Sequence, residues 1–286
     1  MSGENIDVKA LLRASEFRFN KNLGQNFITD KNLLSAIVCD AGVNEGDIVV
    51  EIGTGAGTLT REIAKKAKKV ISFEVDERLL GVLNETLKGL SNVDVVFKDV
   101  LKLSDEKLKE HIGPGPFKVV ANLPYYVTTP MIMRFLESGL DAVSLTVMVQ
   151  KEVADRLCAA PGTKDYAQIT LMVKLMGEAS ITRKVPREVF FPSPNVDSAV
   201  VRIDIDRSRY DEKQKKMAAK VIKRAFAMRR KTLLNNLTAG LSLTRDEAKE
   251  CILSCGFSEN VRGEELSLED YFKLSEKIFN LVKRIK

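Results

Sequence analysis

Histidine and cysteine are scarce in this sequence, which argues against the common zinc-binding arrangements. His111 is the only histidine, and the four cysteines are scattered, with Cys251 and Cys255 as the only close pair. A structural zinc site takes several His or Cys ligands at short spacings, so we expect no metal. We interpret the cysteines as reduced thiols, mostly in the core.

Long apolar runs are absent as well. No run approaches the roughly 20 residues that a membrane-spanning helix needs, and the N-terminus has no apolar segment of the signal-peptide type. The 286 residues, 44% of them hydrophobic, suit one large domain plus a small one. We therefore expect a cytoplasmic protein with no membrane partner. Separately, we expect it to be a monomer.

Acidic residues are comparatively few in the C-terminal part of the chain. From Arg207 onward there are 19 Lys and Arg against 11 Asp and Glu, whereas the first 206 residues hold 26 against 28. The N-terminal arm also carries Arg13, Arg18 and Lys21. This asymmetry favours a polyanionic partner, nucleic acid before membrane. A solvated charged surface on a helical domain is the equal alternative.

A glycine-rich turn follows the first expected strand, at residues 48–52. The strand runs into Gly53-Thr54-Gly55-Ala56-Gly57, and a helix is expected from Leu59. A strand, a glycine turn and a helix start predict a nucleotide or cofactor site, although glycines can also serve packing alone. Thr58 stands where a dinucleotide fingerprint has its third glycine. Glu51 would repel a pyrophosphate but suits the cationic S-adenosylmethionine, so the pattern favours that cofactor over NAD.

Acidic residues end the next two expected strands. Glu74 stands 21 positions after Gly53, which matches the acid that takes a ribose hydroxyl pair. Asp99 could accept a hydrogen bond from an adenine amino group. The alternative for Asp99 is an exposed turn aspartate.

A fourth expected strand, at residues 117–121, leads into Asn122-Leu123-Pro124-Tyr125. Alkylation of an amino group on a flat base needs acceptors for its N–H groups and a π-face for its ring. Asn122 offers an amide oxygen, Pro124 brings no competing N–H, and Tyr125 offers the ring. A turn in which Asn and Pro serve only backbone geometry is the alternative.

The rest of the pattern predicts an α/β domain followed by a helical one. Strands are expected at 142–149, 181–185 and 198–205, and helices at 151–159 and 167–176. Strand signals stop near Arg207, and three or four helical stretches follow. We therefore place a catalytic domain at 1–206 and a helical domain at 207–286.

Two features of these segments point to substrate. Phe190 and Phe191 precede a proline-rich loop, where they form either a stiff wall with exposed rings or part of the core. Basic residues crowd the first C-terminal helix and its exit: Lys213, Lys215, Lys216, Lys220, Lys223, Arg224, Arg229, Arg230 and Lys231.

Taken together, these motifs resemble the ribosomal RNA adenine N6,N6-dimethyltransferases of the KsgA type across almost the whole chain. The matching segments are GQNF around Asn26, EIGTGAG from Glu51, FEVD around Glu74, KDV around Asp99, NLPYY from Asn122, QKEVADRL from Gln150, FFPSPNVDSAV from Phe190 and RRKTLLNNL from Arg229. Eight segments in this order and spacing are specific. The resemblance implies a class I, Rossmann-like methyltransferase fold, with a seven-stranded sheet that has one antiparallel strand, plus a small helical C-terminal domain.

The resemblance also implies roles for individual residues. The cofactor-binding set is Asn26, Ile28, Glu51, Gly53, Gly55, Glu74, Val75, Asp99, Val100 and Asn122, with Glu51 helping to hold the cofactor's ammonium group. The catalytic set is Asn122, Leu123, Pro124 and Tyr125. The substrate-binding set is Tyr125, Phe190, Phe191, Arg229, Arg230 and Lys231.

The implied reaction is methyl transfer from S-adenosylmethionine to N6 of two adjacent adenosines near the 3′ end of small-subunit rRNA, and the implied partner is the immature small subunit. Two alternatives remain open. An Erm-type enzyme would dimethylate large-subunit rRNA, although Leu123 stands where that pattern tends to have Ile. An assembly factor would act mainly by binding RNA.

Overall fold

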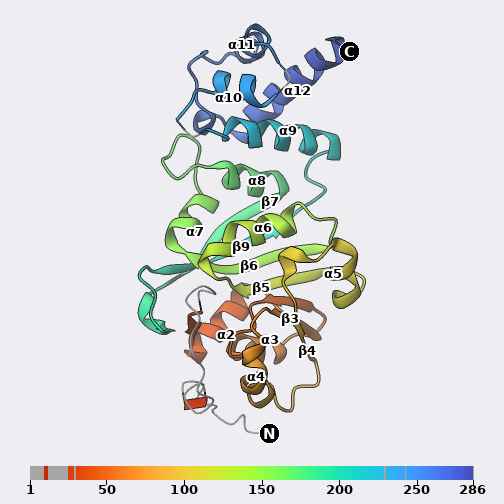
Figure 1. Ribbon diagram of the computed structural model, residues 1–286, viewed down its shortest axis with the longest axis vertical. Helices are drawn as coiled ribbons and strands as arrows, with labels where there is room; N and C mark the ends of the chain where they lie inside the picture. Colours follow the sequence, from red (N-terminus) through yellow and green to blue (C-terminus); the bar gives the residue numbers. More distant parts are fainter. Residues whose placement is uncertain (1–9, 12–24, 29, 229, 242, 286) are drawn as a thin grey trace. The chain divides into compact units, whose positions relative to one another are not determined.

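The computed structural model describes residues 10–11, 25–28, 30–228, 230–241 and 243–285 (Figure 1). These residues form two compact units. The first comprises the described residues up to Ala154 together with Ser180–Ile205, and the second comprises Asp155–Ala179 and the chain from Asp206. No helix in the described ranges is long and apolar enough to cross a membrane. The basic arm around Arg13 and the predicted substrate residue Arg229 lie outside the described residues.

The first unit is built on a seven-stranded sheet in the order β4-β3-β2-β5-β6-β9-β7. The pairings from β4 to β6 are parallel, and β9 pairs antiparallel with β6. The bounds are β2 Ile48–Ile52, β3 Lys69–Glu74, β4 Val93–Phe97, β5 Phe117–Asn122, β6 Ala142–Gln150, β7 Gly177–Val185 and β9 Ser198–Ile205. The methyltransferase-type sheet expected from the sequence is confirmed.

The central strands are buried on both faces, which explains their apolar, β-branched composition. Val49, Val50, Val70, Val119 and Val120 are at most 1% exposed. The helices of this unit are α2 Lys31–Asp40, α3 Thr58–Ala64, α4 Leu80–Thr86, α5 Asp105–Ile112, α6 Thr128–Leu136 and the start of α7 Lys151–Leu157.

The chain reverses its direction across the sheet between β2 and β5. From β2 it proceeds outward to β3 and β4, then returns to β5 beside β2 and continues to β6 on the other side. In open α/β sheets the crevice at such a reversal, at the carboxyl ends of the strands, is where ligands bind. The glycine turn after β2 and the Asn122 segment after β5 therefore flank one crevice.

A short antiparallel ribbon brings the N-terminal segment to this crevice. Strand β1 (Phe27–Ile28) pairs with β8 (Phe190–Phe191), with Phe27 opposite Phe191 and Ile28 opposite Phe190. The side chains of Ile28 and Phe190 enter a core cluster that also contains residues of the central strands. This packing fixes residues 25–28 beside the strand ends.

The second unit is helical, with β7 beginning within it. Helix α8 (Gln168–Met176) packs on α9 (Glu212–Ala225) and α12 (Leu268–Ile285), and α10 (Leu233–Gly240) packs on α9 and α11 (Arg245–Ser254). Capping boxes begin two of its helices. Thr244 and Glu247 exchange hydrogen bonds at the start of α11, and Ser267 and Asp270 do so at the start of α12.

Outside the cavity, the structure departs from the sequence expectations in three places. Residues 155–179 belong to the helical unit, not to the unit that holds the sheet, because α8 packs on α9 and α12. Of the four free cysteines only Cys251 is buried, so the expectation of mostly core cysteines is wrong. Lys215 is 4% exposed and donates to the Arg207 carbonyl, so it is not part of a basic surface.

Candidate active site

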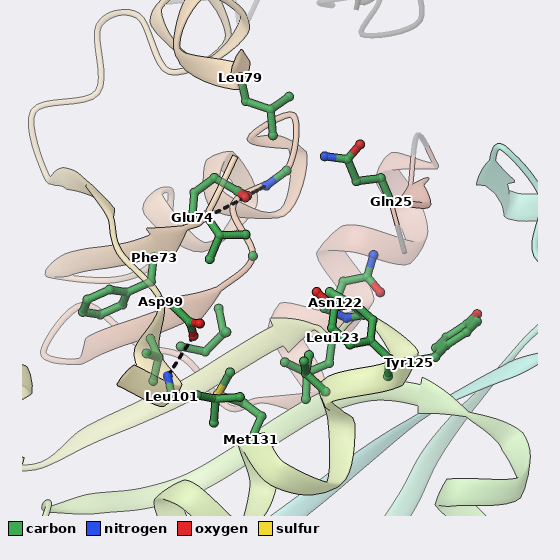
Figure 2. Close-up of a pocket in the computed structure, with 18 of the residues that line it drawn as sticks. Gln25, Phe73, Glu74, Leu79, Asp99, Leu101, Asn122, Leu123, Tyr125 and Met131 are labelled. Carbon is green, nitrogen blue, oxygen red and sulfur yellow. Dashed lines mark hydrogen bonds between the residues drawn. The ribbon is translucent and has the colours of Figure 1, made fainter. Parts of the chain in front are cut away.

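A cavity of about 480 Å³ opens at the carboxyl ends of β2, β3, β4 and β5, at the reversal point of the sheet (Figure 2). Its volume lies within the roughly 300–1,000 Å³ typical of small-molecule sites. Most of the predicted site residues line it: Asn26, Gly53, Gly55, Glu74, Val75, Asp99, Val100, Asn122, Leu123, Pro124, Tyr125 and Phe190.

Glu74, the last residue of β3, is held by the backbone around it. Its Oε2 accepts from the Gly55 N–H at 2.9 Å, and its Oε1 accepts from the N–H groups of Val75 and Asp76 at 2.8 and 2.9 Å. Burial raises the pKa of this carboxyl, and the three N–H bonds oppose that rise. A carboxylate has about four acceptor positions, so about one remains for a ribose hydroxyl. To accept from both ribose hydroxyls, Glu74 would have to use an acceptor position that a backbone N–H already occupies.

Glu51 differs from the sequence expectation. It is fully buried and does not line the cavity. Its Oε2 accepts from the hydroxyls of Thr60 and Ser72, both at 2.6 Å, while Oε1 has no hydrogen-bond partner among the described residues. Burial raises the pKa of Glu51 to about 8 against the opposing effect of these bonds. Glu51 therefore lies behind the cavity wall, and its predicted role toward the cofactor's ammonium group stays a prediction.

Asp99 ends the segment after β4 and serves as an N-cap. Its Oδ1 accepts from the Leu101 N–H at 3.0 Å at the start of η3 (Val100–Lys102), and its Oδ2 lies 3.7 Å from Lys102 Nζ. Asp99 therefore caps the turn and also lines the cavity, so the two interpretations of this residue are compatible. Val100 beside it is buried in the cavity wall.

Asn122 ends β5 with its amide group oriented by the N-terminal segment. Its Nδ2 donates to the Asn26 carbonyl at 3.1 Å. That bond leaves Oδ1, for which no donor is seen among the described residues, as a hydrogen-bond acceptor at the cavity. In Figure 2 the side chain lies between Glu74 and Tyr125.

Tyr125 begins the turn η4 (Tyr125–Val127), and its ring extends away from Glu74 and Asp99 (Figure 2). Its hydroxyl lies 2.9 Å from Ser198 Oγ on β9, which fixes the ring. Phe190 is 5% exposed and also lines the cavity. An aromatic ring and a carboxamide acceptor therefore lie together at the end of β5.

Several predicted residues are not brought to this cavity. The Ile28 side chain is in the core, and its predicted role, which concerns its backbone, stays a prediction. Phe191 pairs with Phe27 in the ribbon without lining the cavity. Arg230 and Lys231 are exposed in the segment between α9 and α10 of the second unit.

The cavity also includes residues that were not assigned from the sequence: Gln25, Phe27, Ile52, Phe73, Leu79, Phe97, Lys98, Leu101, Lys102, Tyr126, Val127 and Met131. Most of them lie within two positions of a predicted residue, so extending each motif by two residues would have found them. Leu79 and Met131 come from a helical turn and from α6, and no local signal marks them.

Comparison with known proteins shows the family. A family model described as ribosomal RNA adenine dimethylase matches residues 16–280. The chain belongs to this family. Within the dimethylase family, a protein of Alkaliphilus oremlandii named ribosomal RNA small subunit methyltransferase A is 46% identical over 280 residues, covering 97% of this chain and 96% of the relative. The chain is therefore an enzyme of the dimethylase family.

Two solved structures extend the likeness to the fold. A dimethyladenosine transferase from Plasmodium falciparum is 25% identical with a TM-score of 0.71, covering 87% of this chain and 95% of that one. The 23S rRNA methyltransferase ErmE is 26% identical with a TM-score of 0.67, covering 89% of this chain and all of that one. The two scores are close, so the fold alone does not separate the two kinds of enzyme.

Proposed function

We propose that this dimethylase-family protein transfers methyl groups from S-adenosylmethionine to N6 of two adjacent adenosines near the 3′ end of small-subunit rRNA, forming N6,N6-dimethyladenosine during small-subunit biogenesis. The observation that carries the proposal is the Asn122 amide. Its Nδ2 is bonded to the Asn26 carbonyl, so Oδ1 is presented to the cavity as an acceptor beside the Tyr125 ring.

The residues present fit the cofactor. Gly53 has a φ of +81°, and a Cβ there would point toward the Asn122 carbonyl 3.8 Å away, into space between the turn and β5. A methionine-type chain needs that space. Glu74 and Asp99 keep acceptor positions for hydroxyl and amino groups, and their negative charge favours a ligand without phosphate.

When bound, S-adenosylmethionine supplies a methyl group on a sulfonium that a nucleophile can displace. The chain's own residues orient that nucleophile. Asn122 Oδ1 and the Leu123 carbonyl would accept the two N–H groups of the target N6, which directs its lone pair to the methyl donor. Tyr125 and Phe190 would hold the base, which must leave its stack to reach them.

The reaction needs no general base in this arrangement. N6 becomes acidic once it carries the methyl group, so its proton can pass to water. Catalysis then rests on proximity and orientation, which are worth several kcal/mol when reacting atoms are held in line. The second transfer requires that the pocket accept N6-methyladenine.

Small-subunit rRNA is favoured over large-subunit rRNA by the sequence relatives. The relative named for the small subunit is 46% identical, whereas ErmE is 26% identical. The exposed Arg230 and Lys231 of the helical unit would contact RNA phosphates.

The experiment is transfer of labelled methyl from S-adenosylmethionine to unmethylated small subunits and, separately, to protein-free large-subunit rRNA. Digestion and mass analysis identify the modified base. Dimethyladenosine only in small subunits is the expected result. Label only in large-subunit rRNA would assign the protein to the Erm type. Cofactor binding with no label in either RNA would favour a role in assembly through binding.

A further inference from the structure

Two adjacent tyrosines follow the Asn122 segment, and only Tyr125 has a role so far. Tyr126 also lines the cavity, yet its side chain is 60% exposed, the highest value among the exposed large hydrophobic residues of the described chain. A large ring left this open at the wall of a ligand cavity suggests a surface that a ligand covers.

The backbone sends the two rings in different directions. Residues 125–127 form a 3-10 turn, η4, in which successive side chains are about 120° apart. The Tyr125 hydroxyl bonds to Ser198 at the start of β9. Because β9 and β3 lie on opposite sides of β5 in the sheet, this bond places the Tyr125 ring away from β3 and β4.

Tyr126 lines the cavity together with Glu74, which ends β3, and Asp99, which follows β4. Burial raises the pKa of its hydroxyl, and the negative charges of Asp99 and Glu74 raise it further. Those two carboxyl groups end the segments after β4 and β3, so the Tyr126 side chain lies near both of them. The same wall contains the half-exposed Val75 and the apolar residues Phe97 and Leu101.

We propose that Tyr126 binds the methyl donor, forming the outer wall of the part of the cavity that takes its adenosine. Of the two tyrosines in this turn, Tyr125 then holds the target base and Tyr126 covers the cofactor. The proposal rests on the proposed use of S-adenosylmethionine. Such a site places the adenine between apolar side chains and an aromatic ring, with carboxylates at its amino and ribose edges. Each part of the adenosine then has a contact.

The test is equilibrium binding of S-adenosylhomocysteine and of 5′-methylthioadenosine to the full-length protein without RNA. The second probe has the adenosine but no amino acid. Tyr126→Ala should raise the dissociation constant of both probes by roughly tenfold, the size expected when a base loses an aromatic contact. Tyr126→Phe, which keeps the ring, should stay within about twofold of the wild type.

Tyr125→Ala is the matched control, because it removes the neighbouring ring of the same turn. It should bind both probes like the wild type while losing methyl transfer. Thermal melting of each variant verifies that it is folded, and the exposure of Tyr126 makes a large change in stability unexpected.

Two outcomes would overturn the proposal, and a third would refute the proposed function on which it rests. Unchanged affinity in Tyr126→Ala for both probes would remove Tyr126 from the cofactor site, and an accompanying rise in KM for RNA would make it an RNA contact. A loss seen with S-adenosylhomocysteine but not with methylthioadenosine would place the contact at the methionine end. Failure of the wild type to bind S-adenosylhomocysteine would instead refute the proposed function.

Discussion

At the scale of single residues, Glu51 shows how burial changes the chemistry of an acid. Its carboxyl group is fully buried beneath the glycine turn, with Oε2 bonded to Thr60 and Ser72. Ser72 Oγ lies 2.6 Å from the Thr54 hydroxyl, which extends the network to the turn itself. Desolvation makes the protonated acid the stable form at pH 7. We infer that Glu51 supports the shape of the turn.

This residue predicts a pH dependence of stability. The unfolded carboxyl ionises near pH 4.5 and the native one near pH 8, so the native state binds more protons between these values. The contribution of Glu51 to the free energy of unfolding therefore falls as pH rises from 4.5 to 8, by at most about 1.4 kcal/mol per pH unit, and is level above pH 8. Glu51→Gln should lack this decline.

Urea unfolding at several pH values between 5 and 8 measures the effect. The difference in unfolding free energy between Glu51→Gln and the wild type should shift in favour of the variant as pH rises. The exposed Glu85→Gln serves as a control and should follow the wild type. A constant difference for Glu51→Gln would show that Glu51 is charged in the folded protein across this range.

Substitutions of Asn122 and Tyr125 should impair methyl transfer while cofactor binding is retained. Asn122→Ala removes the Oδ1 acceptor, and Tyr125→Ala removes the stacking ring. Each should lower the rate of methyl transfer by roughly 100-fold or more, because orientation carries the reaction. Tyr125→Phe loses only the bond to Ser198, worth about 1 kcal/mol, and should retain most activity.

Single-turnover methyl transfer and separate cofactor binding measure these effects. We expect the alanine variants to bind S-adenosylhomocysteine. Retained dimethylation in Asn122→Ala or Tyr125→Ala would refute the assignment of the catalytic residues.

At the scale of elements, the segment between α9 and α10 is shaped by one buried amide. Asn236 of α10 is 1% exposed. Its Oδ1 accepts from the Met228 N–H at 2.9 Å, and its Nδ2 donates to the carbonyls of Ala225 and Met228. These bonds fix the backbone that leads to Arg230 and Lys231.

Asn236→Ala should therefore destabilise the helical unit. It leaves the buried Ala225 carbonyl and the partly buried Met228 N–H without this partner, which costs about 1–3 kcal/mol. The neighbouring Asn235, whose side chain accepts from the exposed Arg245, is the matched control. Asn235→Ala should change the free energy of unfolding by no more than about 0.5 kcal/mol. Equal effects in urea unfolding would contradict the assigned role of Asn236.

At the scale of the whole molecule, charge is distributed unevenly along the chain. The residues from Arg207 onward carry the net positive charge, and the preceding residues are slightly acidic. In the helical unit the buried Lys215 is neutralised locally by an ion pair with Glu212. Arg230 and Lys231 remain exposed.

Reversal of these two charges predicts a salt-dependent loss of RNA affinity. Arg230→Glu with Lys231→Glu should weaken binding at low salt and reduce the slope of log K against log salt by about 1 to 2, because each phosphate contact contributes just under 1. Filter binding to small-subunit rRNA at several salt concentrations measures the slope.

Lys66→Glu with Lys68→Glu gives the same change in net charge in the first unit. These exposed lysines precede β3, so they lie near the amino end of that strand, whereas the cavity lies at its carboxyl end. We expect a smaller loss of affinity and little change in slope. Equal slopes for the two double variants would show that only net charge matters.

The sequence predicted most of this molecule because its signals are local. Short apolar runs marked the strands, and the residue at each strand end marked the cavity, since parallel strands bring their carboxyl ends to one edge. Glu74, Asp99 and Asn122 were found in this way. Asp30, Thr244 and Ser267 cap helix starts through bonds that need only the neighbouring backbone.

Contacts between distant segments decided the rest. Whether Glu51 faced the ligand or the core depended on Thr60 and Ser72 on neighbouring elements. The bond between Asn122 and Asn26, the ribbon formed by β1 and β8, and the packing of α8 on α9 and α12 join residues far apart in sequence. Residue types and spacing fixed the fold class and the family because they encode local geometry. Burial and long-range hydrogen bonding decided which side chains are charged, which can still accept a hydrogen bond from a ligand, and which unit a helix joins. Those properties exist only once the chain is packed.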